Sequence, residues 1–138
     1  MATDLILVDI NGEAVGQVAR EVEALGVKAH TFCVDVTDRD QVKNLADTVR
    51  ARWGAVDILV NSAGIGHMSY MLDASLEDRK RFLDVNLWSV IHMVNAFVPE
   101  MIERKSGHIV NMSGGQAFFT VPTWGAYACT KFAVDGYS

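Results

Sequence analysis

The chain has 138 residues, of which 50% are apolar, so it is long enough for one domain with a buried core. No apolar run approaches the ~18 residues that a membrane-spanning helix needs, which argues against a membrane protein. The 12 basic and 17 acidic residues give a net charge of −5 without a basic cluster, which argues against nucleic acid as a partner.

Four short apolar runs predict strands, and the amphipathic segments between them predict helices. The expected strands cover Leu5–Asp9, Ala29–Val34, Val56–Asn61 and His108–Ser113. The expected helices cover Asn11–Leu25, a segment from Thr37 or Asp38 to Trp53, Leu76–Arg104 with a kink or tighter turn at Pro99, and Trp124–Ser138. This alternation, with strands apolar throughout, predicts an α/β fold: a doubly wound parallel sheet buried between helices.

Metal and secretion patterns are not found in the sequence. The four histidines and the two cysteines, Cys33 and Cys129, show no metal-ligand spacing, so no metal site is expected. The cysteines lie far apart and predict reduced thiols in a cytoplasmic protein. The first residues, MATDLILVD, include acidic side chains and are not expected to act as a signal peptide.

Polar side chains stand at or just after the ends of the four expected strands: Asp9, Asp35, Asn61 and Ser113. Ligands of parallel α/β sheets bind at this edge, so we expect the four residues to line one crevice. Asp9 could accept hydrogen bonds from the two hydroxyls of an adenosine ribose and repel a 2′-phosphate, although an acid here is equally a turn former. Asp35 could bind an adenine amino group, but its neighbours in DVTD also suit a helix cap.

The segment Asn61-Ser62-Ala63-Gly64 places small residues directly after a buried strand. Small residues let the backbone approach a bulky ligand closely, although such loops also occur without a ligand.

Tyr127 and Lys131 lie four residues apart near the start of the last helix, which places them on one helix face. A tyrosine packed over a lysine stem is the commoner explanation of such a pair. Their position after a strand and loop would also direct them to the crevice, where an ammonium favours the phenolate and makes Tyr127 a usable acid or base. Asn86 lies among apolar neighbours and must satisfy its amide, either structurally or as part of a proton path.

Together, the segments LVDIN, DVTD, NSAG, DVNLWS, HIVNMS and YACTK resemble the short-chain dehydrogenase/reductase family in order and spacing, over essentially all 138 residues. The resemblance implies a Rossmann-type fold that binds NAD(H) or NADP(H) and moves hydride between the cofactor and an alcohol or carbonyl carbon. It assigns Tyr127 as the general acid/base and Lys131 to the phenolate and the nicotinamide ribose. Asn86 would anchor a water that leads to Lys131.

The resemblance also implies a cofactor site. Asp9 would select NAD over NADP, and Asp35 and Val36 would contact the adenine. Asn61, Ala63 and Gly64 would form the floor beneath the cofactor, although Ser62 replaces an asparagine that is usual in this motif.

Two departures from the family pattern bear on function. Family members carry a serine thirteen residues before the tyrosine, which polarises the substrate oxygen; here that residue is Gly114, and Ser113 is expected to serve instead. The family also begins with a strand and a TGxxxGxG loop that holds the pyrophosphate, and nothing similar precedes Leu5. In the family strand order 3-2-1-4-5-6-7 that strand lies mid-sheet. We therefore expect residues 1–138 to form a partial Rossmann-type domain, without the first and the later strands, whose two halves share no neighbour and expose apolar edges.

Three functional hypotheses stay open. The first is an NAD-dependent oxidoreductase for a small, apolar alcohol or carbonyl compound, with a homodimer or homotetramer possible. Its apolar pocket would use the following side chains, which could equally be core or interface: Met68, Tyr70, Met71, Phe118, Phe119 and Trp124. The second is a dinucleotide-binding module whose catalysis is impaired by Gly114, and the third is an inactive truncated fragment.

Overall fold

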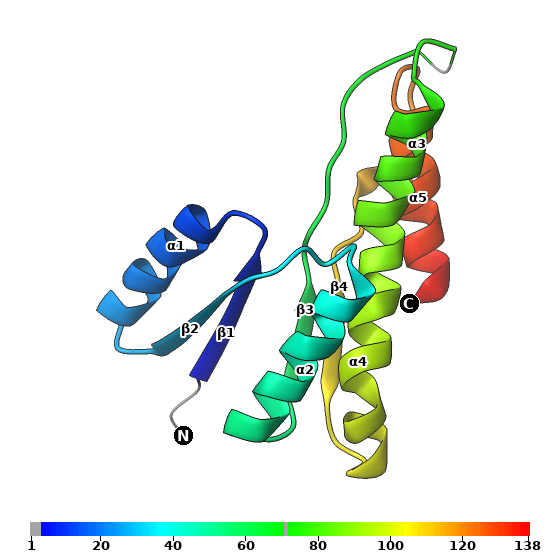
Figure 1. The fold of residues 1–138 in the computed structure, drawn as a ribbon. Coiled ribbons are helices and arrows are strands. Elements are labelled where there is room, and N and C mark those ends of the chain that lie inside the picture. The colour runs from blue at the N-terminus through cyan, green and yellow to red at the C-terminus, as the bar shows by residue number, and fades with distance from the viewer. Residues whose placement is uncertain (1–3, 71) are drawn as a thin grey trace.

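A computed structural model describes residues 4–70 and 72–138, which form an α/β fold with parallel strands (Figure 1). The α/β class with parallel strands that the sequence predicts is confirmed. In chain order the elements are β1 (Asp4–Asp9), α1 (Gly12–Ala24), β2 (Lys28–Cys33), α2 (Arg39–Trp53), β3 (Ile58–Asn61), α3 (Leu76–Leu83), the π-helical turn η1 (Asp84–Trp88), α4 (Ser89–Glu103), β4 (His108–Asn111), the 3₁₀ turn η2 (Gly115–Ala117) and α5 (Gly125–Tyr137).

Helix boundaries follow local chemistry that is readable in the sequence. Asn11 Oδ1 accepts hydrogen bonds from the backbone N–H groups of the first turn of α1, and Asp38 Oδ1 does the same for α2. Hydrogen bonding to the backbone and side chain of Gln41 lowers the pKa of Asp38. Gly54, with a φ of 81°, follows the last residue of α2 in a conformation that favours glycine.

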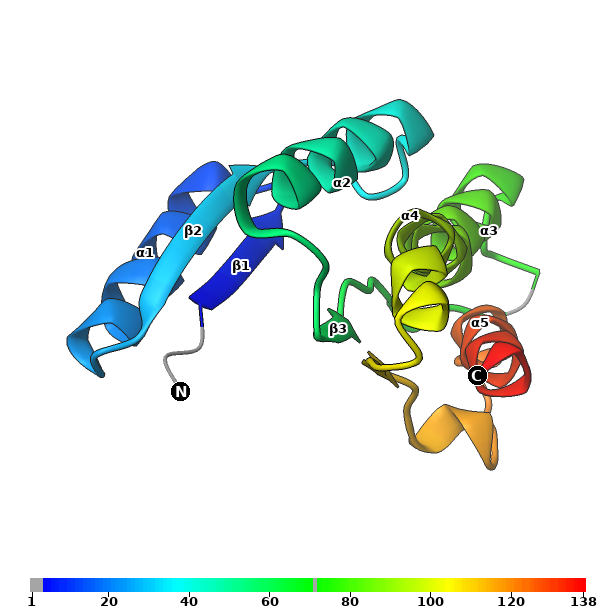
Figure 2. The same ribbon diagram turned by 90° about the horizontal axis from the view of Figure 1, so that it is seen from below.

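The strands form two separate pairs. β1 runs parallel to β2, with Asp4 opposite Lys28, and β3 runs parallel to β4, with Ile58 opposite His108. Among the described residues no strand joins the two pairs. Figures 1 and 2 both place β1, rather than β2, on the side that faces β3. The expectation of two halves without a shared neighbour agrees with this arrangement.

The prediction that the strands are buried on both faces is wrong for β3. Ile58 and Val60 are 60% and 55% exposed, whereas Leu59 is 6% exposed. Side chains alternate between the two faces of a strand, so Leu59 faces the helices while its two neighbours face the uncovered side. Helix α1 shows the same effect. Leu25, the residue directly after α1, is 83% exposed, and the main contacts of α1 are with β1 and β2.

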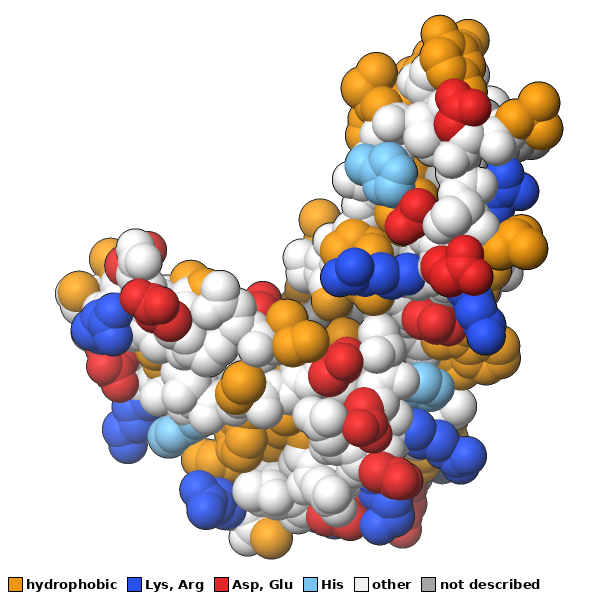
Figure 3. All heavy atoms as spheres, turned by 45° about the horizontal axis from the view of Figure 1, so that its top comes forward, with side chains coloured by type: hydrophobic (Ala, Val, Ile, Leu, Met, Phe, Trp, Pro, Cys, Tyr) orange, Lys and Arg blue, Asp and Glu red, His pale blue; other side chains and the backbone are white. Residues whose placement is uncertain are grey.

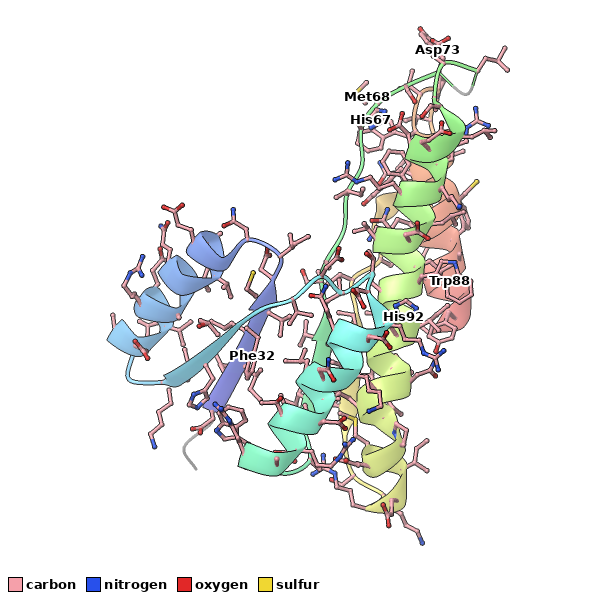
Figure 4. All side chains as sticks on the ribbon, in the orientation of Figure 1. Phe32, His67, Met68, Asp73, Trp88 and His92 are labelled. Carbon is pink, nitrogen blue, oxygen red and sulfur yellow. The ribbon has the colours of Figure 1, made fainter. Side chains whose placement is uncertain are left out.

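The core lies where α2 and α4 meet β3. Its buried members are Val42, Leu45, Ala46, Val49, Leu59, Met93, Phe97 and Met101. Phe32 of β2 points toward α2 (Figure 4). Phe32 packs against this cluster, and so do Ile6 and Val8 of β1. Helix α2 therefore connects the two strand pairs through apolar contact. Full burial of one large apolar side chain stabilises the fold by about 1.5–3 kcal/mol.

The long helix expected over Leu76–Arg104 is three consecutive elements, α3, η1 and α4. The π-helical turn η1 interrupts the regular pattern at Asp84–Trp88, and Asn86 lies at its centre. Helix α4 continues through Pro99 to Glu103. Within residues 4–70 and 72–138, no helix is both long and apolar enough to cross a membrane.

Candidate active site

Tyr127 and Lys131 share one face of α5. Tyr127 is half-buried, and Lys131 is 5% exposed with its Nζ 5.6 Å from the centroid of the Tyr127 ring. The Lys131 ammonium donates a hydrogen bond to the backbone carbonyl of Met112, just after β4, at 2.9 Å. Burial lowers the pKa of Lys131. The structure thus holds a desolvated cation beside a phenol, between α5 and the end of β4.

Asn86 is fixed by three hydrogen bonds and is 1% exposed. Its Oδ1 accepts from the Ile65 N–H at 2.8 Å, and its Nδ2 donates to the Ile65 carbonyl at 2.9 Å. The remaining Nδ2 proton goes to Thr130 Oγ1 at 2.9 Å. The amide therefore ties the loop after β3 to α5, and the π-helical turn brings it to that junction.

Thr130 is a site residue that the sequence analysis did not identify. Its hydroxyl accepts from Asn86 and donates to the Tyr127 backbone carbonyl at 2.7 Å, and its side chain is 1% exposed. The available clue in the sequence was a threonine directly before Lys131, whose hydroxyl would need a partner if it were buried. Thr130 links Asn86 to the turn of α5 that carries Tyr127.

Three glycines let the backbone approach Tyr127 and Lys131. A Cβ built on Gly64 would lie 3.4 Å from Asn86 Oδ1 and 3.7 Å from Lys131 Nζ. A Cβ on Gly66 would lie only 2.6 Å from Tyr127 Cδ2, so position 66 admits no side chain unless the ring moves. A Cβ on Gly114 would lie 3.6 Å from the Tyr127 hydroxyl. The role of Gly66 was also not identified from the sequence, since the contact joins residues far apart in the chain.

Ser113 and Gly114 differ in where they point. Ser113 Oγ donates to the Lys131 backbone carbonyl at 3.5 Å. Gly114 has an extended backbone, with φ 179° and ψ 168°, so neighbouring residues project to opposite sides of the segment. Position 114 is the one that faces the Tyr127 hydroxyl.

The residues expected at the adenosine end lie in the other half of the molecule. Asp9 Oδ1 accepts from the Asn11 N–H at 2.8 Å, and Asp35 Oδ1 accepts from the N–H and hydroxyl of Thr37 at 2.9 and 2.7 Å. The Val36 carbonyl lies 3.3 Å from His92 Nδ1 of α4. Within residues 4–70 and 72–138, no hydrogen bond or ion pair joins Asp9 or Asp35 to Asn61 or Ser113, so the single crevice stays a prediction.

Asn61 closes the end of β3. Its Nδ2 donates to Asn111 Oδ1 of β4 at 2.8 Å, and the side chain is 7% exposed, while Ala63 after it is exposed. This hydrogen bond holds the start of the loop over residues 61–64 against the end of β4.

Lys131 offers hydrogen-bond donors and Asp9 offers acceptors that could bind the two ribose groups of a dinucleotide. Lys131 has three N–H donors, of which one is used by Met112, and Asp9 has a second carboxylate oxygen beside the one that caps Asn11. A glycine-rich phosphate loop of the TGxxxGxG kind is not found in the printed sequence. The described residues also contain no cluster of His, Cys, Asp and Glu suited to a metal ion.

Apolar side chains gather at the tip of the molecule, in the loops before α3 and α5. Met68, Tyr70, Phe118 and Phe119 are 65%, 66%, 78% and 63% exposed, and Met71 lies outside the described residues. Figure 3 shows hydrophobic side chains over this tip, and Figure 4 places Met68 and His67 on the segment that runs beside α3. The Ser69 N–H donates to the Thr123 carbonyl at 2.9 Å, which joins the two loops.

Comparison with known proteins places this geometry in a family. Residues 2–138 match the family model described as short chain dehydrogenase. The chain is 33% identical over 137 residues to estradiol 17-beta-dehydrogenase 11 from Homo sapiens, covering 99% of this chain and 46% of the relative. It spans about half the length or less of the curated relatives it matches.

Solved structures give the same result. A gluconate 5-dehydrogenase from Burkholderia cenocepacia in complex with NADP and tartrate superposes with a TM-score of 0.88 at 34% identity, over 96% of this chain and 52% of that one. An NAD⁺-bound xylitol dehydrogenase superposes with a TM-score of 0.93 at 30% identity, over 98% and 52% of the two chains. One neighbour was therefore solved with NADP and the other with NAD⁺.

Proposed function

The chain belongs to the short chain dehydrogenase family, and we propose that it carries the acid/base centre of an oxidoreductase that moves hydride between NAD(H) and an alcohol or carbonyl compound. The observation that supports this most is the network in which Asn86 and Thr130 hold the turn of α5 that presents Tyr127 and Lys131. A structural tyrosine–lysine pair needs no such buried connection to the distant loop at Ile65.

When bound, the nicotinamide cofactor supplies or accepts the hydride. Tyr127 gives its hydroxyl proton to the carbonyl oxygen in the reduction, and takes a proton from the alcohol in the reverse direction. Lys131 favours the phenolate through its charge, and its two remaining N–H donors suit the hydroxyls of the nicotinamide ribose. Asn86 holds the loop at Ile65 and would anchor a water leading to Lys131.

NAD is the cofactor that we propose. A carboxylate at Asp9 favours two free ribose hydroxyls and disfavours a 2′-phosphate. Asp35 and Val36 would contact the adenine, while Asn61, Ala63 and Gly64 would lie beneath the cofactor. NADP is the less favoured alternative, which the NADP-bound neighbour keeps open.

We further propose that residues 1–138 form part of a Rossmann-type domain, and that a strand with a glycine-rich loop completes it between β1 and β3. The unpaired facing edges of β1 and β3 and the exposed Ile58 and Val60 support this. That loop would supply the amides that hold the pyrophosphate.

The substrate that fits best is a small, apolar alcohol or carbonyl compound. The exposed side chains of Met68, Phe118 and Phe119 beside the site support an apolar wall. A homodimer or homotetramer and a cytoplasmic location, the latter based on two free cysteines, stay predictions.

A dinucleotide-binding module with impaired catalysis is the second candidate. The specific observation in its favour is Gly114, which offers no hydroxyl at the position that faces Tyr127.

The first test is a fluorescence titration of the purified 138-residue chain with NADH and NADPH. Saturable binding that favours NADH would support the cofactor site and Asp9 as its selector. Tyr127→Phe tests the acid/base role in the full native protein, with Tyr137→Phe on the same helix as the matched control. We expect a loss of about 10²–10⁴-fold in kcat for Tyr127→Phe alone. Equal turnover of both variants would refute the acid/base role, and NADH binding without turnover by the parent would favour the second candidate.

A further inference from the structure

The space beside Gly114 is where a substrate oxygen would meet the hydroxyl of Tyr127. Three groups converge on it: a Cβ built on Gly114 would lie 3.6 Å from Tyr127 Oη, 3.8 Å from Gln116 Oε1 and 4.0 Å from Lys131 Cγ. A carbonyl oxygen that gains negative charge needs a hydrogen-bond donor besides the acid that protonates it. Gly114 has no side chain to provide one.

Ser113 is poorly directed for this task. Its hydroxyl is turned to the Lys131 backbone carbonyl, and the extended backbone at Gly114 sends the side chain of residue 113 to the opposite side of the segment. To serve as donor, Ser113 would have to give up that bond and the segment would have to shift by one residue.

Gln116 approaches the same space from the 3₁₀ turn η2. The Ala117 N–H bonds to the Gly114 carbonyl at 2.9 Å, which curls the chain so that residue 116 returns toward position 114. The Gln116 side chain is half-buried, and the hydrogen bonds found among the described residues include none to its amide. A half-buried amide without a protein partner is available to a ligand.

The geometry points to Gln116 as the second hydrogen-bond donor to the substrate oxygen, in place of the hydroxyl that Gly114 lacks. The terminal amide torsion is roughly two-fold, so a half-turn exchanges Oε1 for Nε2 and presents an N–H at the same place. In the reduction, the carbonyl carbon gains the hydride, the two electrons of the C=O π bond move to the oxygen, and that oxygen takes the proton of Tyr127. Gln116 donates a hydrogen bond to the oxygen throughout and transfers no proton. This inference rests on the proposed function and names a residue of the same site.

The test compares variants of the full native protein with NADH and the apolar probes benzaldehyde and cyclohexanone. Gln116→Ala and the isosteric Gln116→Glu both remove the amide donor, and each should lower kcat/KM by about 10²–10³-fold while the Kd for NADH changes little. Ser113→Ala tests the competing donor, and its loss in kcat/KM should be much smaller than that of Gln116→Ala. Since position 114 has room for a Cβ, adding Gly114→Ser to Gln116→Ala should restore at least tenfold of the lost rate.

The outcomes separate this inference from the proposed function. A parent that reduces the probes and a Gln116→Ala variant that does so equally well would overturn the role of Gln116 alone. A loss at Ser113→Ala instead would assign the donor to Ser113. An inactive parent that becomes active through Gly114→Ser would also overturn the role of Gln116, while supporting the chemistry of Tyr127. No NADH binding and no turnover in any variant would overturn both.

Discussion

Gly66 lies against the ring of Tyr127, and replacing it with alanine gives a prediction whose size follows from the contact. The added Cβ would stand 2.6 Å from Cδ2, 3.0 Å from Cε2 and 3.3 Å from Cγ of the ring. Carbon atoms in ordinary contact are about 3.5–4.0 Å apart, so the ring or the loop must withdraw by roughly 1 Å.

The ring has little freedom to withdraw. Trp124 packs edge-on against it, with ring centroids 5.2 Å apart, and Lys131 Nζ lies 5.6 Å from its centroid. Overpacking of this kind costs about 1–3 kcal/mol in the free energy of unfolding. A displacement of about 1 Å at an acid/base group can cost about 10²-fold in rate. We therefore expect Gly66→Ala to lose both stability and kcat/KM.

Two glycines provide controls for the assay, which combines urea unfolding of the chain with kcat/KM of the full native protein. Gly136→Ala in α5 meets no atom within 4 Å and should be neutral or gain up to about 1 kcal/mol, since alanine is the better helix former. Gly107→Ala would meet Met101 at 2.5–2.7 Å and should lose stability while keeping kcat/KM, since it lies outside the site. Gly66→Ala with the stability and rate of Gly136→Ala would refute the close contact with Tyr127.

Three further predictions concern the network and the cofactor. Thr130→Val should lose about 1–3 kcal/mol in urea unfolding, because an Asn86 N–H loses its buried partner, whereas Thr130→Ser should keep most of that stability; equal values would contradict the bridge. The pKa of Lys131 is lowered in the folded state, so the unfolded chain binds more protons between that pKa and the ordinary 10.5, and the free energy of unfolding should rise with pH in that window. Lys131→Met should lack this rise when unfolding is measured at pH 7, 8.5 and 10, and an identical pH slope in both proteins would exclude the buried charge as its cause. Asp9→Ser should raise the affinity for NADPH relative to NADH in the titration, with Asp4→Ser at the other end of β1 as control; an unchanged ratio would remove Asp9 as the selector.

The sequence predicts those parts of the fold that depend on near neighbours. Asn11 and Asp38 lie at the starts of their helices, where the sequence predicts those starts, because a cap needs only the next three residues. The burial of β3 was not predictable in this way. An apolar run indicates a strand that prefers to be covered, but whether Ile58 is covered depends on which strands and helices lie beside it.

In the candidate site, too, the sequence predicts the features that depend on near neighbours and misses those that depend on distant residues. A spacing of four predicts that Tyr127 and Lys131 share a face, and the structure shows them together. The π-helical turn at Asn86 was not predictable, because it accompanies bonds to Ile65 and Thr130, which lie 21 and 44 residues away. The contact of Gly66 with Tyr127 likewise depends on how a loop returns to a helix.

The two halves of the proposed cofactor site, the acid/base end after β3 and the adenosine end at β1 and β2, are stabilised by different contacts. This difference determines which property a completing strand would change. The bonds of Asn86 and Lys131 all run between segments that follow β3, so the acid/base geometry is fixed without β1 and β2. The carboxylates of Asp9 and Asp35, by contrast, accept hydrogen bonds only from Asn11 and Thr37 in their own turns. These bonds fix the local geometry of each carboxylate but not its distance from Tyr127. Helix α2 connects the halves through apolar packing, to which the Arg50–Glu100 ion pair and the His92–Val36 contact add polar links. Apolar packing is less directional than a strand ladder. A strand paired to both β1 and β3 would set that distance, so its effect should appear in NADH affinity and leave the hydrogen bonds around Tyr127 unchanged.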